Sequence, residues 1–130
     1  MSDERGTASL ELALVVPTLM LLVLGVLQFG LWHHAQSVVQ SAALEGARVA
    51  AAEDGTEDAG RARAVELVGE GLGDAAVQTG ASASVAPEAA TVRVTARLRA
   101  LLPIPGLNSF PLSSQASIFR ERFRPAEDER

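Results

Sequence analysis

RGTASLELALVVPTLMLLVLGVLQFGLW, which runs from Arg5 to Trp32, is the stretch of sequence that decides the fold. Its 21 residues from Leu12 to Trp32 include no charged side chain. As a helix that rises 1.5 Å per residue, these residues would span about 31 Å, which matches the roughly 30 Å hydrocarbon core of a bilayer. The stretch therefore predicts a transmembrane helix.

The composition excludes several classes of function. The net charge of −5 argues against nucleic-acid binding, because no broad basic face is available to neutralise phosphates. The absence of Cys excludes disulfides, thiolate metal sites and Cys nucleophiles. His33 and His34 are adjacent, so on a helix they point about 100° apart and are poorly placed to share a metal ion. With no serine elbow and no phosphate loop, we expect no catalytic residue, cofactor or metal, and no enzyme.

An acidic side chain at the leading edge of the apolar run has two interpretations. Glu11 follows Gly6 by five residues. In the simpler interpretation its carboxylate lies among lipid headgroups, because an acid inside a membrane needs water or a partner. In the other, a peptidase cuts a pilin-type signal between Gly6 and Thr7. Glu11 would then be the fifth residue of the mature chain, where it could neutralise the new α-amino group of a neighbouring subunit.

The apolar run has three possible fates: a cleaved secretory signal, an uncleaved anchor, or a processed pilin-type anchor. A secretory signal is disfavoured, since the run is long and the following HHAQSVVQS offers no small-x-small cleavage site. Arg5 precedes the run, and the next Lys or Arg after it is Arg48. This asymmetry favours a cytoplasmic N-terminus.

The pattern beyond the run predicts an α+β domain attached to the same helix. The helix should extend from about Ala8 to Ala52, with a kink at Pro17. A stripe of small and apolar residues on its outer half indicates packing against a sheet or a second helix, with a protein-binding surface as the alternative. The stripe consists of Ala35, Val38, Val39, Ala42, Gly46, Val49 and Ala50.

A second helix and three strands should follow. Thr56 can cap a helix that runs to about Leu72. Its expected inner face is Ala64, Val65, Val68 and Leu72. A period of two then predicts a three-stranded antiparallel sheet, over 77–85, 91–100 and about 112–122, with the long helix covering one face. In the middle strand Val92, Val94, Ala96 and Leu98 should point inward. In the first strand the alternation places Val77, Thr79, Ala81, Ala83 and Val85 on one face, and in the third Leu112, Ala116 and Ile118 lie on one side.

Two features of the sheet region leave alternatives open. Arg93, Arg97 and Arg99 alternate along the middle strand, as expected of a solvated strand face or of an anion site. LLPIPGLNSF, residues 101–110, reads as a stiff apolar loop that either folds over the open end of the sheet or contacts a partner. The candidate partner residues are Leu101, Leu102, Ile104, Leu107 and Phe110.

These patterns divide the chain into five segments: a leader (1–6), a transmembrane segment (7–34), an extracytoplasmic continuation of the helix (35–52), a small α/β extracytoplasmic domain (53–123) and a disordered charged tail (124–130). The expected fold is thus a long N-terminal transmembrane helix that extends into a small pilin-like domain. Membrane lipid is the partner that the residues themselves indicate.

Several residues in this order resemble the TadE-like family, the pseudopilins of tight-adherence (Flp-type) pilus systems. The resemblance rests on Gly6, Glu11, Pro17, the Gln28-Phe29-Gly30 triplet and the later Glu45-Gly46-Ala47-Arg48-Val49-Ala50. It implies a minor pilin-like subunit in the cytoplasmic membrane, trimmed by a prepilin peptidase. Such a subunit would act with other pilins or pseudopilins and with the membrane platform proteins of the pilus machine. The alternative is an uncleaved, single-pass envelope binding module.

Overall fold

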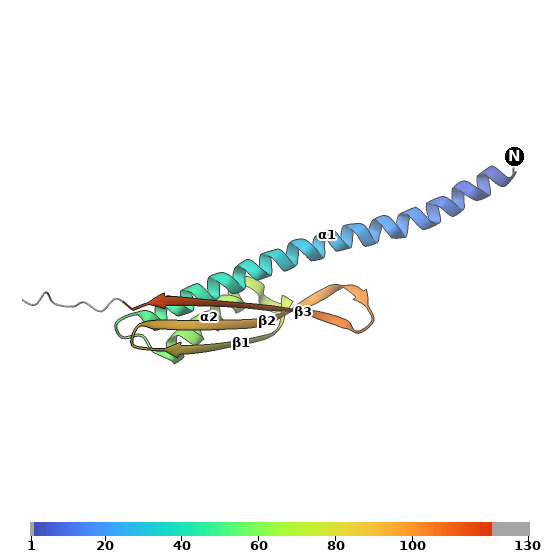
Figure 1. The fold of residues 1–130 in the computed structure, drawn as a ribbon. Coiled ribbons are helices and arrows are strands. Elements are labelled where there is room, and N and C mark those ends of the chain that lie inside the picture. The colour runs from blue at the N-terminus through green and yellow to red at the C-terminus, as the bar shows by residue number, and fades with distance from the viewer. Residues whose placement is uncertain (1, 121–130) are drawn as a thin grey trace, which may run out of the picture.

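The computed structural model of the protein describes residues 2–120, and Figure 1 shows its fold. The elements are α1 (Ser2–Ala51), α2 (Glu57–Leu72), the short 3₁₀ helix η1 (Gly73–Ala75), β1 (Ala76–Val85), β2 (Ala89–Ile104) and β3 (Leu107–Phe119). The predicted α+β architecture, with a long apolar helix, a second helix and an antiparallel sheet, is confirmed. The predicted disordered tail lies outside the described residues.

The helix α1 is a single rod of 50 residues. It continues through Pro17, and Figure 1 shows a gentle curve along its length where we expected a kink. Its first half extends away from the rest of the molecule, and its second half packs on the domain. The membrane-length run and the domain are therefore joined by continuous helix.

The domain has two layers. The strands pair in the order β1-β2-β3, all antiparallel, so β2 is central. The second half of α1 covers β2 and β3, while α2 covers β1. The predicted inward residues of β2 form the centre of the core. Val92, Val94 and Leu98 are fully buried, together with Val39 from α1 and Val68 from α2.

The predicted faces are wrong at two positions. Val77 is 55% exposed, because the strand register shifts between Ala76 and Gln78 and the bulge takes Val77 out of the alternation. Val65 is also exposed. Instead, every fourth residue of α2 faces the core. One of these residues is a glycine, which the sequence pattern did not predict to be buried. The buried residues of α2 are Gly60, Ala64, Val68 and Leu72.

The predicted loop over residues 101–110 is wrong as well: β2 and β3 continue through it and form a hairpin. Ile104 pairs with Leu107, and Pro105 and Gly106 form the turn. Gly106 has φ 83°, which, after a proline, is typical of a type II turn. This segment, called here the apolar hairpin (residues 101–110), does not fold over the end of the sheet. It projects past the sheet towards the N-terminal half of α1 (Figure 1).

The N-terminus of α2 gives a first testable prediction. The Thr56 hydroxyl accepts a hydrogen bond from the Ala59 N–H (3.1 Å), which satisfies a donor that the helix itself leaves unpaired. Thr56→Ala should therefore lower the free energy of unfolding by about 1 kcal/mol, measured by urea unfolding of the protein in detergent. Thr56→Ser keeps the acceptor and should stay close to the wild type; an equal loss in both variants would contradict the capping role.

Candidate functional site

The first half of α1 presents large apolar side chains without protein cover. Every described side chain from Gly6 to Val23 is exposed, and Leu22, for example, is 61% exposed. In the described part of the chain, this helix near the N-terminus is the one that is long and apolar enough to cross a membrane. Water is a poor solvent for such a surface, so lipid or neighbouring apolar helices must cover it. This agrees with the predicted membrane anchor.

The proposed cleavage and assembly residues lie on the first turns of this exposed rod. Gly6, Thr7 and Glu11 are all exposed and helical. A helical Gly6–Thr7 bond would have to unwind locally to enter a protease site in extended form. No hydrogen bond or ion pair joins Glu11 to another residue within the described range 2–120. Its carboxylate is thus available to a group outside this chain.

Gln28 is a polar residue within the apolar run, and its side chain links the run to the domain. Its side chain is only 6% exposed, and its Oε1 atom accepts a hydrogen bond from the Leu101 N–H (2.6 Å). Because a backbone N–H can only donate, the amide oxygen must face Leu101, and the Nε2 atom faces elsewhere. Nε2 is buried and has no hydrogen-bond partner among the residues described. Gln28 therefore ties α1 to the base of the apolar hairpin.

An apolar cavity of about 320 Å³ lies between α1 and the hairpin. It is lined by Gly25, Gln28, Phe29, Trp32, Leu102 and Phe110. The rings of Phe29 and Trp32 lie 6.3 Å apart on the helix side. An added Cβ at Gly30, the last residue of the triplet, would meet no atom within 4 Å, so this glycine faces open space.

The candidate partner residues of the hairpin divide into two sets. Leu102, Leu107 and Phe110 are half-buried, and Leu102 and Phe110 line the cavity beside α1. Leu101 and Ile104 are exposed by 48% and 46%. Leu102 and Phe110 thus face α1 across the cavity, whereas Leu101 and Ile104 are left uncovered.

The later motif residues have structural roles within the domain. A Cβ at Gly46 would lie 2.8 Å from the Gly60 carbonyl oxygen, so this pair of glycines lets α1 and α2 approach closely. Glu45 and Arg48 form a surface ion pair (3.3 Å), of a kind that contributes little stability. The stripe predicted on α1 is largely buried against α2 and the sheet, which confirms the packing interpretation, and the pattern missed Ala43 and Ala47 on the same face.

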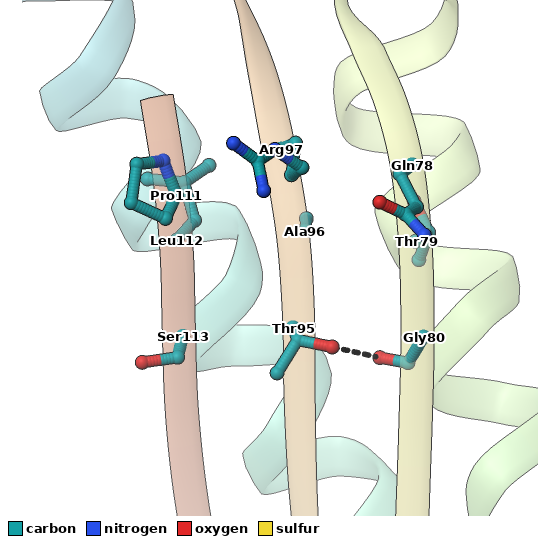
Figure 2. Close-up of a pocket in the computed structure, with 9 residues that line it drawn as sticks. All are labelled: Gln78, Thr79, Gly80, Thr95, Ala96, Arg97, Pro111, Leu112 and Ser113. Carbon is teal, nitrogen blue, oxygen red and sulfur yellow. Dashed lines mark hydrogen bonds between the residues drawn. The ribbon is translucent and has the colours of Figure 1, made fainter. Parts of the chain in front are cut away.

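Figure 2 shows Arg97 on the face of the sheet opposite the helices. Arg93 and Arg99 have the same parity along β2 and alternate with buried residues, so they share this outer face. An open depression of about 440 Å³ there is lined by Arg97 and residues of all three strands. Arg93 donates to Gln115 Oε1 (2.5 Å), and Arg97 donates to Ser109 Oγ (3.0 Å). Arg93, Arg97 and Arg99 are all exposed. Exposed arginines paired with neutral side chains favour the solvated-face interpretation.

The comparison with known proteins gives a family match that lies within α1. Residues 6–48 match the model of the family described as TadE-like protein. This segment is TadE-like. The resemblance seen in the sequence is thereby confirmed, and no curated protein and no solved structure matches the chain. The family indicates involvement in a tight-adherence pilus.

The TadE-like segment includes all the motif positions from Gly6 to Arg48. It covers the exposed apolar half of α1, Gln28, and the glycine contact with α2. The sheet and the apolar hairpin follow the matched range. The family match therefore lies within α1. The hairpin lies outside the match and contacts α1 through the hydrogen bond from the Leu101 N–H to Gln28.

Proposed function

We propose that the protein is a minor pilin-like subunit, a pseudopilin, that takes part in the assembly of a tight-adherence pilus. The observation that carries this proposal is the uncovered apolar half of α1 inside a TadE-like segment, with Glu11 near its start and no partner for its carboxylate among the described residues. Such a helix packs equally well against lipid tails and against like helices. A subunit that is held in a membrane and then assembled into a helix bundle needs this property.

In the proposed arrangement the N-terminus is cytoplasmic and the domain lies outside the cytoplasmic membrane. A prepilin peptidase would cut between Gly6 and Thr7, and membrane platform proteins would move the subunit into contact with other pilins or pseudopilins. Within the bundle, the Glu11 carboxylate would pair with the α-amino group of Thr7 on a neighbouring subunit. In apolar surroundings this attraction is far stronger than in water. The role is one of assembly and not of catalysis.

The competing function is an uncleaved anchor for an envelope binding module, and the mature N-terminus separates the two. We expect the intact mass and N-terminal sequence of the protein from its native membrane to show a chain that begins at Thr7. A chain that begins at Met1 or Ser2 would favour the uncleaved anchor. A start beyond His34 would identify a secretory signal.

Glu11→Ala tests the role of the carboxylate in assembly. The variant should insert at least as well as the wild type, because it removes a charge from the edge of the apolar run. The variant should no longer cross-link to neighbouring subunits. This is measured in native membranes, by detecting cross-linked species through a tag on the mature domain. Leu12→Ala is the matched control, since it shortens the adjacent exposed side chain and removes no charge. Unchanged cross-linking in Glu11→Ala would refute the assembly role.

A further inference from the structure

We propose that the apolar hairpin is a second membrane contact, which enters the outer lipid leaflet beside α1 and holds the domain against the bilayer. The proposal rests on the membrane placement of α1 in the proposed function. It adds an interaction surface outside the TadE-like segment, and it commits to one partner, the lipid surface.

The position of the hairpin along α1 is the first argument. The hydrogen bond between Leu101 N–H and Gln28 places the base of the hairpin beside a residue of the apolar run. Gln28 lies four residues before Trp32, which is about 6 Å along the helix axis towards the membrane centre. From Leu101, β2 continues for three more residues to Ile104, about 10 Å further. Figure 1 shows this extension pointing towards the N-terminal half of α1. A bilayer around the run would therefore contain the hairpin.

The side chains of the hairpin suit that position. No charged residue occurs from Ala100 to Phe119. Leu101 and Ile104 remain about half exposed although they are large and apolar. Arg97 and Arg99 lie just before this stretch and are exposed, on the side where lipid headgroups would lie. Arginine there can extend its guanidinium to lipid phosphates while its stem covers apolar surface.

The backbone of the hairpin also limits the cost of leaving water. Unpaired N–H groups are expensive in lipid, which normally excludes open strand edges. Three positions in or beside the hairpin, Pro103, Pro105 and Pro111, are prolines and have no N–H. The Leu101 N–H is satisfied by Gln28, and Ile104 pairs with Leu107 at the tip. The other backbone polar groups of the hairpin favour placing it near the headgroup–acyl boundary and not at the bilayer centre.

Site-directed spin labelling of the full chain tests the proposal, since the protein contains no Cys of its own. Ile104→Cys and Leu101→Cys would each be labelled in protein reconstituted into phosphatidylcholine–phosphatidylglycerol vesicles. Collisions with oxygen, which partitions into lipid, are compared with collisions with a water-soluble nickel chelate. Leu22→Cys reports on the span itself, and Gln115→Cys, exposed on the outer face of the sheet, reports on water.

We expect the oxygen-to-nickel collision ratio at Ile104 to be several-fold higher than at Gln115 and to approach that at Leu22. A water-like ratio at Ile104 and Leu101, with a lipid-like ratio at Leu22, would overturn the hairpin proposal and leave the anchor intact. Low collision rates with both reagents at Ile104 would also overturn it, because a neighbouring protein would then cover the hairpin. A water-like ratio at Leu22 would refute the membrane span, and with it the proposed function.

Discussion

Replacing Leu98 with alanine should lower the free energy of unfolding of the domain by about 2–5 kcal/mol. Leu98 is the largest of the fully buried side chains, and it lies on the central strand, opposite Ala76 of β1 and Phe110 of β3. Its removal would leave a cavity between the sheet and the helices. The surrounding residues are mostly alanine and valine, whose short side chains have little capacity to refill the space.

Leu101→Ala is the matched control, because it makes the same change three residues further along β2 at an exposed position. Urea unfolding in detergent, followed by circular dichroism, should show a small effect for Leu101→Ala and a large one for Leu98→Ala. Similar losses in the two variants would mean that burial does not determine the stability of this strand. Leu101→Ala keeps the backbone donor to Gln28, so that hydrogen bond should survive.

Gly46→Val should also destabilise the domain, through overpacking and not through a cavity. A Cβ at this position would lie 2.8 Å from the Gly60 carbonyl oxygen, 3.0 Å from the Ala64 Cβ and 3.3 Å from a Val92 methyl group. All three contacts are with backbone or short side chains that cannot swing away. We expect α2 to be displaced from α1, with a loss of about 1–3 kcal/mol or more.

Gly69→Val is the control for the glycine change. Gly69 is exposed on α2, and an added Cβ there would meet no atom within 4 Å. Valine has a better helix propensity than glycine, so this variant should be neutral or slightly more stable in the same urea experiment. If Gly46→Val unfolded at the wild-type urea concentration, the close approach of α1 and α2 would not be needed for stability.

Local pattern in the sequence was enough to predict most of the fold. The apolar run and the three- and four-residue spacing after it predicted α1 to within one residue at its outer end. Thr56 predicted the start of α2, because its capping hydrogen bond depends on neighbours only three residues away. The alternation in β2 predicted which side chains face the core. Each of these patterns depends only on residues that are close together in the sequence.

The errors arose where contacts between distant residues decide the outcome. The bulge that exposes Val77 depends on the pairing of β1 with β2, which the alternation in one strand does not contain. The structural role of Gln28, for which the sequence made no prediction, depends on Leu101, 73 residues later in the chain. The hairpin did carry a local signal in its Pro105-Gly106 turn, but its prolines and apolar composition resembled a stiff loop.

The unbroken α1 also acts as a lever between the membrane and the domain. From Trp32 to Ala51 the helix is about 29 Å long, so a 20° tilt of its membrane half would swing the far end sideways by about 10 Å. Rotation about the helix axis is transmitted just as directly, because no hinge interrupts the rod. A neighbouring protein that fixes the orientation of the membrane half of α1 therefore also fixes the direction in which the sheet faces.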